Sequence, residues 1–222
     1  MHKIVLSEDG SHTIISEKFG VAYHSKHGAL QETETVFLNA GLQYAIDNNP
    51  TIVNILEMGF GTGLNAIMTF LKDTKDIKIN FHTIEAYPIP EVIYSQLNYP
   101  ELLNMDKYQH QIFIDMHKGN TGTTYALSPN FNFTKHILLL EDFDPGDQKF
   151  DVIYYDAFAP SSQEELWSEE MMVNLASMCN TNGALVTYCA KGSFKRALRA
   201  AGFTVEGLPG PKGKREMTRG II

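Results

Sequence analysis

A glycine-rich turn between a buried-strand pattern and a helical pattern constrains this 222-residue chain more than any other feature. Residues 52–57 are an apolar run, Gly59, Gly61 and Gly63 follow at alternate positions, and residues 64–71 have helical character. Glycine permits a tight turn and a close approach of the backbone to a ligand. The helix start that follows offers unpaired N–H groups to an anionic group. We therefore expect an α/β fold that binds a ligand at this turn.

Apolar runs alternate with helical segments through the rest of the chain, which is typical of a mostly parallel sheet covered by helices on both faces. Seven strands are predicted, at residues 52–57, 77–85, 136–141, 151–155, 184–189, 203–206 and 216–222. The last two of these could form an antiparallel pair. Helices are predicted at residues 64–71, 90–98, 100–108, 164–178 and 193–200, and residues 117–134 are predicted to be a loop.

The first 48 residues are predicted to form an N-terminal extension to a main domain at residues 49–222. Short segments at residues 4–6, 13–15 and 21–23 are separated by glycines and predict small antiparallel strands. Residues 31–48 have helical spacing, and Pro50 is expected to end that helix.

The turn itself narrows the choice of ligand. It has no Gly-Lys-Ser/Thr sequence, which excludes a triphosphate-binding loop, and its Gly-x-Gly-x-Gly spacing differs from the usual dinucleotide pattern. Glu85 ends the next predicted strand, where a carboxylate can accept both hydroxyls of a ribose. Glu57 precedes the first glycine and is expected to place negative charge near the loop, which suits a cationic ligand. S-adenosylmethionine, with its sulfonium and amino groups, is the predicted cofactor.

Acidic residues also end the next two predicted strands. Asp142 is a candidate acceptor for an adenine amino group. Asp156 is expected at the same edge of the sheet, where a carboxylate can accept a proton or orient a nucleophilic amine. Phe158 and Pro160 follow it and could form a wall for a planar base.

Composition excludes several classes of protein. No apolar run approaches the length of a membrane-spanning helix, and the N-terminus does not resemble an export signal. Two cysteines, Cys179 and Cys189, cannot form a disulfide framework, and we expect both to be buried thiols in a reducing cytoplasm. The eight histidines are scattered, and no metal site is expected.

The charge distribution is asymmetric. The net charge is −8, yet the segment from Lys191 to Ile222 carries eight basic and only two acidic residues. An acidic body with a basic C-terminal edge can hold a polyanion on one face, although a solvated helix and a charged tail would give the same pattern.

Three groups of residues resemble one methyltransferase family, the methyltransferase domain of the tRNA 5-methylaminomethyl-2-thiouridine biosynthesis bifunctional protein. They are residues 55–65 around the glycine turn, the Tyr-Asp-Ala-Phe-Ala-Pro sequence at 155–160, and the Gly-Lys-Arg-Glu-Met sequence at 213–217. A further match at residues 28–38 extends the resemblance over nearly the whole chain. The resemblance implies a Rossmann-like class I fold, with cofactor contacts from Glu57, Gly59, Gly61, Gly63, Asn65, Glu85 and Asp142.

The resemblance also implies a reaction: methyl transfer to the exocyclic amine of 5-aminomethyl-2-thiouridine at the tRNA wobble position. Asp156 would take up or orient the amine proton, Phe158 and Pro160 would contact the base in the anticodon loop, and Lys212, Lys214 and Arg215 would contact phosphates. Many family members carry a second, FAD-dependent oxidase domain, and neither that step nor FAD is expected in this chain. Either another protein makes the aminomethyl precursor, or the substrate differs. The alternatives are an aminopropyltransferase of the spermidine-synthase kind and an inactive tRNA-binding module.

Overall fold

An eight-stranded sheet organises the chain, for which a computed structural model describes residues 3–49, 51–72, 74 and 76–222. Five inner strands run parallel to one another, and the three outer strands are antiparallel to their neighbours. In spatial order the strands are β5 (Thr124–Ser128), β6 (Phe131–His136), β4 (Lys78–Ile84), β3 (Ile52–Met58), β7 (Phe150–Tyr155), β8 (Cys179–Thr187), β10 (Glu216–Ile221) and β9 (Thr204–Pro209).

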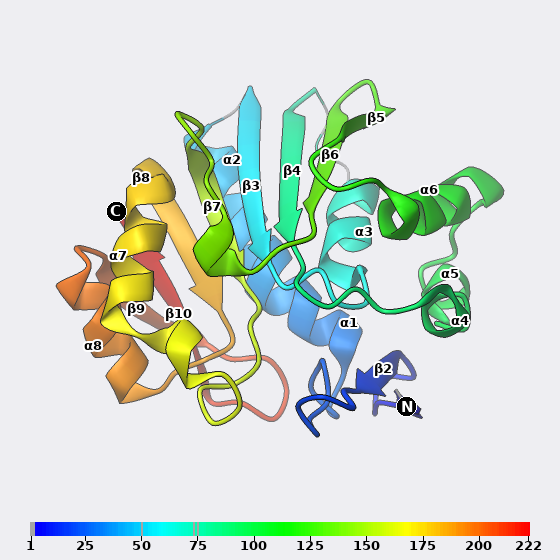
Figure 1. Cartoon of the computed structure of the whole chain (residues 1–222), viewed down its shortest axis with the longest axis horizontal. Helices are drawn as coiled ribbons and strands as arrows, with labels where there is room; N and C mark the ends of the chain where they lie inside the picture. The colour runs from blue at the N-terminus through cyan, green and yellow to red at the C-terminus, as the bar shows by residue number, and fades with distance from the viewer. Residues whose placement is uncertain (1–2, 50, 73, 75) are drawn as a thin grey trace.

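Alternate residues of the inner strands enter two separate cores, one on each face of the sheet. In β7, Val152 and Tyr154 pack into one core, while Ile153 and Tyr155 pack into the other. This is the period-two alternation of an extended strand. Helices cover both faces (Figure 1): η1 (Thr33–Leu42), α3 (Leu64–Leu71) and α6 (Lys107–Lys118) lie on one side, and α7 (Glu169–Met178) and α8 (Gly192–Ala200) lie on the other. The predicted α/β fold with a mostly parallel sheet is confirmed.

The N-terminal extension pairs two strands, β1 (Lys3–Leu6) and β2 (His12–Ile15), and continues into a long helical segment. The helical segment comprises α1 (Ala29–Glu32), η1 and α2 (Gln43–Asn48), so the helix predicted at residues 31–48 is confirmed. The third predicted strand is reduced to a single bridge between Ile15 and Ala22. Pro50 lies outside the described residues, and the division of the chain at residue 49 stays a prediction.

The prediction was wrong for the segment from residue 117 to residue 142. The predicted loop contains β5 and β6, which raises the strand count from seven to eight, and the predicted strand at 136–141 ends at His136. Phe131 and Phe133 alternate with polar residues and are both buried, so β6 follows a half-buried strand pattern within polar sequence. Ile137 and Leu139 are apolar but exposed, and residues 140–142 form the short helical turn η2 (Leu140–Asp142).

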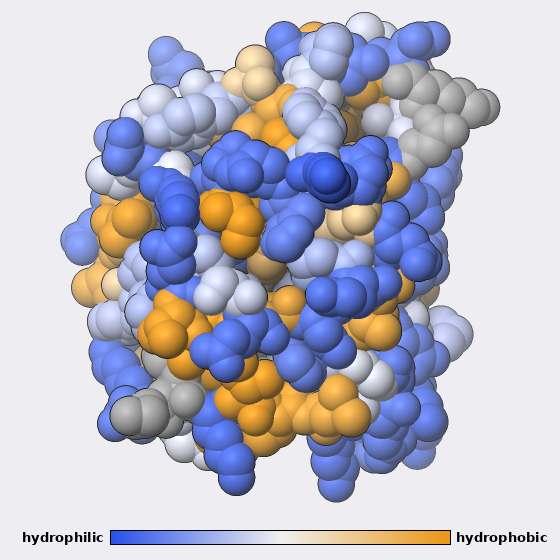
Figure 2. Space-filling model, turned by 90° about the vertical axis from the view of Figure 1, so that its right-hand side faces the viewer, coloured by the Kyte–Doolittle hydropathy of each residue, from blue (hydrophilic) through white to orange (hydrophobic). Residues whose placement is uncertain are grey.

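Three helical segments follow β4: α4 (Glu91–Tyr94), α5 (Tyr99–Leu102) and α6. The first two confirm the predicted helices in part, and α6 extends well past the predicted end at residue 108. The side of the molecule that carries these helices is mostly hydrophilic, with apolar side chains in small patches (Figure 2). Val92 in α4 and Tyr108 in α6 are exposed, and scattered exposed apolar residues of this kind are ordinary on a protein surface.

The strand order places a switch point beside β3. The chain passes from β3 to β4 and β6 on one side, then returns to β7 on the other side. Loops at the carboxyl ends of β3 and β7 therefore diverge, and such a point is where open α/β sheets bind ligands. The N-terminal strands lie beyond these strand ends (Figure 1). Among the described residues, no helix has the length and apolar character needed to cross a bilayer.

Candidate functional site

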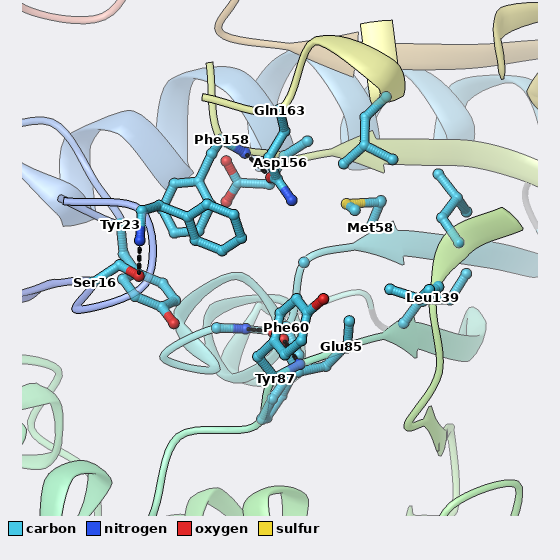
Figure 3. A pocket seen from close by; sticks show the side chains of 18 of the residues that line it. Ser16, Tyr23, Met58, Phe60, Glu85, Tyr87, Leu139, Asp156, Phe158 and Gln163 are labelled. Atoms are coloured by element: carbon cyan, nitrogen blue, oxygen red, sulfur yellow. Dashed lines mark hydrogen bonds between the residues drawn. The ribbon is translucent and has the colours of Figure 1, made fainter. Parts of the chain in front are cut away.

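A cavity of about 670 Å³ lies at the switch point, between the carboxyl ends of β3, β4 and β7 and the N-terminal extension. This volume is within the range of small-molecule and cofactor sites. Asp156 and Phe158 lie on one side of it, and Phe60, Glu85 and Tyr87 lie on the other (Figure 3). The cavity therefore lies at the glycine turn, where the sequence predicts that a ligand binds.

The glycine turn forms part of the cavity wall, and its three glycines have positive φ angles that other residues rarely adopt. Gly59 has φ +93°, and a Cβ added there would lie 2.8 Å from the carbonyl oxygen of Asp156. Gly61 has φ +50°, and its Cβ would lie 2.8 Å from the ring of Tyr23. Gly63 caps α3 from a position outside the cavity lining. The turn needs glycine both for its conformation and for the close contacts around it.

Glu85 organises the cavity from the end of β4. Its two carboxylate oxygens accept hydrogen bonds from the backbone N–H groups of Gly61 and Tyr87, each at 2.7 Å. Burial raises the pKa of Glu85, and these two hydrogen bonds and the charge of Lys135 oppose that increase. Lys135 is itself buried and donates to the carbonyl oxygens of Met116 and His117. Glu85 is thus a fixed acceptor that ties the glycine turn to the β4 loop.

Asp156 is held in place by a short chain of hydrogen bonds. The Asn65 side chain donates to its carboxylate at 2.9 Å, and the hydroxyl of Thr33 donates to the oxygen of Asn65 at 2.8 Å. Burial raises the pKa of Asp156 to about 7, and the charge of Glu32 adds to this effect, while Asn65 and Lys214 oppose it. A carboxylate that titrates near neutral pH can accept a proton from a substrate and release it afterwards.

Glu57 lies behind the cavity and outside its lining. One carboxyl oxygen accepts from the hydroxyl of Thr83 at 2.6 Å, and the other, Oε1, has no hydrogen-bond partner among the described residues. Burial raises the pKa of Glu57 to about 8, so the group is mostly neutral at pH 7. Burial therefore disfavours the negative charge predicted at this position.

Aromatic rings surround Phe158. The ring centroids of Phe19 and Tyr23 lie 4.8 Å and 5.0 Å from that of Phe158, and all three rings line the cavity. The amine of Lys18 lies 3.3 Å from the ring centroid of Tyr87, beside the same group. The ring of Phe158 is therefore part of an aromatic cluster and not a single exposed ring.

The other predicted contact residues have different positions. Asp142 is exposed and does not line the cavity, whereas its neighbour Glu141 does. Pro160 lies in a separate, shallower hollow with Tyr188 and Lys214. The structure thus brings together Gly59, Gly61, Asn65, Glu85, Asp156 and Phe158 in one cavity, and places Glu57, Gly63, Asp142 and Pro160 outside its lining.

Two of the predicted phosphate-binding residues have partners within the chain. Lys212 pairs with Glu8 at 3.2 Å, and both side chains are about half exposed or more. Lys214 pairs with Glu32 at 2.9 Å, and Glu32 is buried. Arg215 is exposed, and its side chain makes no ion pair with any described residue.

Sequence reasoning missed the contribution of the N-terminal extension. Ser16, Phe19, Tyr23 and His24 line the cavity, and Glu32 lies beside Asp156. Their local sequence shows only short strands and a helix start, and nothing in it indicates contact with residues 130 positions away. In the sequence, the family resemblance at residues 28–38 was the signal that could have indicated a role for this extension in the site.

These residues fit the predicted cofactor. The cavity has a suitable volume, a glycine cradle at a helix start and a fixed carboxylate at the end of β4. Glu85 is placed to accept ribose hydroxyls, and the start of α3 is placed to meet a carboxylate. No group of three or more metal-ligating side chains is found in the described part of the chain.

Comparison with known proteins gives matches of both sequence and structure. Residues 131–222 match a family described as S-adenosyl-L-methionine-dependent methyltransferase. The chain is 30% identical over 228 residues to the tRNA 5-methylaminomethyl-2-thiouridine biosynthesis bifunctional protein MnmC of Leptospira borgpetersenii, covering 97% of this chain and 34% of that protein. It is 31% identical over 227 residues to MnmC of Cupriavidus metallidurans, covering 96% and 33% respectively. The chain therefore spans about a third of the length of these relatives.

A solved structure has the same fold. The crystal structure of MnmC2 from Aquifex aeolicus superposes with a TM-score of 0.80 and 20% sequence identity, covering 99% of this chain and 69% of that chain. The predicted Rossmann-like fold and the predicted family resemblance are confirmed. The family description of residues 131–222 also confirms S-adenosyl-L-methionine as the predicted cofactor.

Proposed function

We propose that this chain, whose residues 131–222 belong to a family of S-adenosyl-L-methionine-dependent methyltransferases, methylates the exocyclic amine of 5-aminomethyl-2-thiouridine at the wobble position of tRNA. The position of Asp156 carries the proposal, because a carboxylate with a pKa of about 7 at the cofactor cavity suits an amine acceptor. The similarity to MnmC over nearly the whole chain supports this choice of substrate. The aminopropyltransferase and the inactive binding module are not favoured by any of these observations.

Asp156 prepares the acceptor for the reaction. An alkylamine is mostly protonated at pH 7 and must lose a proton to become a nucleophile. Asn65 orients the carboxylate of Asp156, which accepts this proton. S-adenosyl-L-methionine, when bound, supplies a methyl group on a positively charged sulfur. Holding the amine in line with that group supplies most of the rate, and well-oriented pairs gain about 7–11 kcal/mol.

The aromatic cluster of Phe19, Tyr23 and Phe158 is the proposed binding surface for the base. Wobble bases lie in a loop, where they can leave the stack and pack on aromatic side chains. Stacking on an aromatic ring contributes about 1–3 kcal/mol per base. We therefore expect Phe158→Ala to raise the KM for tRNA about 10-fold or more, and Phe158→Tyr to leave it near the wild-type value. Steady-state methylation kinetics would measure both, and an unchanged KM in Phe158→Ala would remove this residue from base binding.

The C-terminal basic residues Lys212 and Arg215 are proposed to contact tRNA phosphates. Both are exposed, and Lys212 would exchange its exposed pairing with Glu8 for a phosphate. We expect the Lys212→Glu, Arg215→Glu double variant to bind tRNA more weakly and to reduce the slope of log affinity against log salt by about 2, one for each lost contact. Filter binding over a salt series would measure this. Lys78→Glu, an exposed lysine at the start of β4 and at the opposite end of the sheet, is the control. Equal slopes in wild type and double variant would place the docking face elsewhere.

The direct test of the proposal is methylation of undermodified tRNA in vitro. The purified chain, S-adenosyl-L-methionine and tRNA carrying 5-aminomethyl-2-thiouridine should yield 5-methylaminomethyl-2-thiouridine, detected by nucleoside mass spectrometry. Methyl transfer to a polyamine instead of tRNA, or no transfer to either, would contradict the proposal.

A further inference from the structure

Lys214 and Glu32 form an ion pair that is built into the wall behind the proposed active site. The two atoms Nζ and Oε2 are 2.9 Å apart, and only 3% of Glu32 is exposed. The pair joins the end of α1 to the segment between β9 and β10, 182 positions away in the chain. The amine of Lys214 also lies 3.8 Å from the ring centroid of Tyr188. The amine of this partly exposed lysine is therefore held by partners within the protein.

The pair is linked to Asp156 through both geometry and charge. Thr33, the residue after Glu32, donates to Asn65, and Asn65 donates to the carboxylate of Asp156. The same helical turn thus carries the buried charge and the first member of the hydrogen-bond chain. The negative charge of Glu32 raises the pKa of Asp156, and the positive charge of Lys214 lowers it.

Other titratable groups also face Asp156, and none of them duplicates the role of Lys214. Glu57 approaches from β3 and is mostly neutral, because burial raises its pKa to about 8. Tyr188 approaches from the end of β8, and burial raises its pKa above the usual value, so it carries no charge near neutral pH. Lys214 supplies the positive charge that opposes Glu32 and burial at Asp156.

We propose that Glu32 and Lys214 are positioning residues, a charge pair with a buried carboxylate and a partly exposed amine, which sets the protonation state and the orientation of the Asp156 carboxylate for proton transfer from the substrate amine. The inference rests on the proposed function, and it assigns Lys214 a role different from binding phosphate. Glu32 holds the amine of Lys214, and Thr33 fixes the Asp156 carboxylate through Asn65. The positive charge of Lys214 favours the ionised form of Asp156.

Two single substitutions should shift the titration of Asp156 in opposite directions. Lys214→Met removes the charge that favours the ionised form, so the pKa of Asp156 should rise by about 1 unit. Glu32→Gln removes the charge that disfavours it, so the pKa should fall by a similar amount. The carboxyl signal in protein labelled with ¹³C aspartate reports this directly, with Asp156→Asn identifying the resonance. The acid limb of kcat/KM for methyl transfer should move in the same two directions.

A double variant controls for unfolding of the Lys214→Met protein. Lys214→Met alone leaves a buried charge without a partner, which can unfold the protein, whereas Glu32→Gln with Lys214→Met removes both charges. Its Asp156 titration should lie between those of the two single variants. Lys214→Arg should restore the wild-type titration. Lys212→Met, in the same segment but paired with exposed Glu8, is the matched control and should leave the titration unchanged.

The outcomes separate this inference from the proposed function. Opposite shifts of the Asp156 resonance support the pair even if the wild-type chain does not methylate tRNA, in which case only the proposed function fails. An Asp156 resonance that stays in place in Glu32→Gln, with the protein folded, would overturn the inference. A weaker and less salt-dependent tRNA affinity in Lys214→Met, without a shift, would also overturn it and return Lys214 to the docking face.

Discussion

The Asp156→Asn variant should transfer methyl groups about 10²–10⁴-fold more slowly than the wild type, while its affinity for S-adenosyl-L-methionine changes little. Asparagine keeps the size of the side chain and can still pair with Asn65, but it cannot accept the amine proton. Single-turnover methylation of tRNA would measure the rate, and calorimetry would measure cofactor affinity. An unchanged rate would remove Asp156 from the mechanism.

The pH dependence of the wild-type enzyme is a second, independent test of the role of Asp156. Burial raises the pKa of Asp156 to about 7, so the fraction able to accept a proton grows as pH rises through neutrality. The kcat/KM for methyl transfer should therefore increase with pH and level off above about pH 8. Asp156→Asn should lose this acid limb, because its side chain does not titrate. A limb that remains in Asp156→Asn would belong to another group.

The Glu85→Ala variant should bind S-adenosyl-L-methionine about 100-fold more weakly, or not measurably. Both carboxylate oxygens of Glu85 accept backbone N–H groups, one of them from the glycine turn. Hydrogen bonds to a charged group contribute about 1.5–3 kcal/mol each, and their loss would leave two donors without this partner and release the turn. The same change removes the proposed acceptor of the ribose hydroxyls. Calorimetry at a temperature where circular dichroism shows a folded protein would measure the loss.

Asp142→Asn is the matched control for this prediction. Asp142 is an acidic residue close to the same edge of the sheet, but it is exposed and does not line the cavity. Its substitution should leave cofactor affinity unchanged. If Asp142→Asn weakened binding and Glu85→Ala did not, the cofactor would occupy a different position from the one inferred here.

The parts of the fold that could be predicted from sequence are those with a strong local pattern. The run from Ile52 to Leu71 contains a buried strand, a glycine turn and a helix, each with its own periodicity, and the structure matches it closely. The β5–β6 pair could not be found in this way, because its polar residues hide the alternation of Phe131 and Phe133. Conversely, apolar Ile137 and Leu139 predicted a strand and are exposed instead.

The residues of the candidate site also divide into those that a local sequence pattern predicts and those that it does not. Glu85 and Asp156 follow strands, and the parallel arrangement of β3, β4 and β7 brings them to one edge of the sheet. The contacts of Phe158 with Phe19 and Tyr23 depend on where the N-terminal extension packs, which no local pattern specifies. Lys214 shows the limit most clearly, since a basic residue in a basic segment predicts a docking role, while its partner is a buried carboxylate from the opposite end of the chain.

A crystal structure of this protein with S-adenosylhomocysteine tests the central claim most directly. We expect density in the cavity between the glycine turn and Asp156, with the ribose beside Glu85 and the sulfur on the side that faces the carboxylate of Asp156. Density at another site, or an Asp156 side chain turned away from the sulfur, would contradict it.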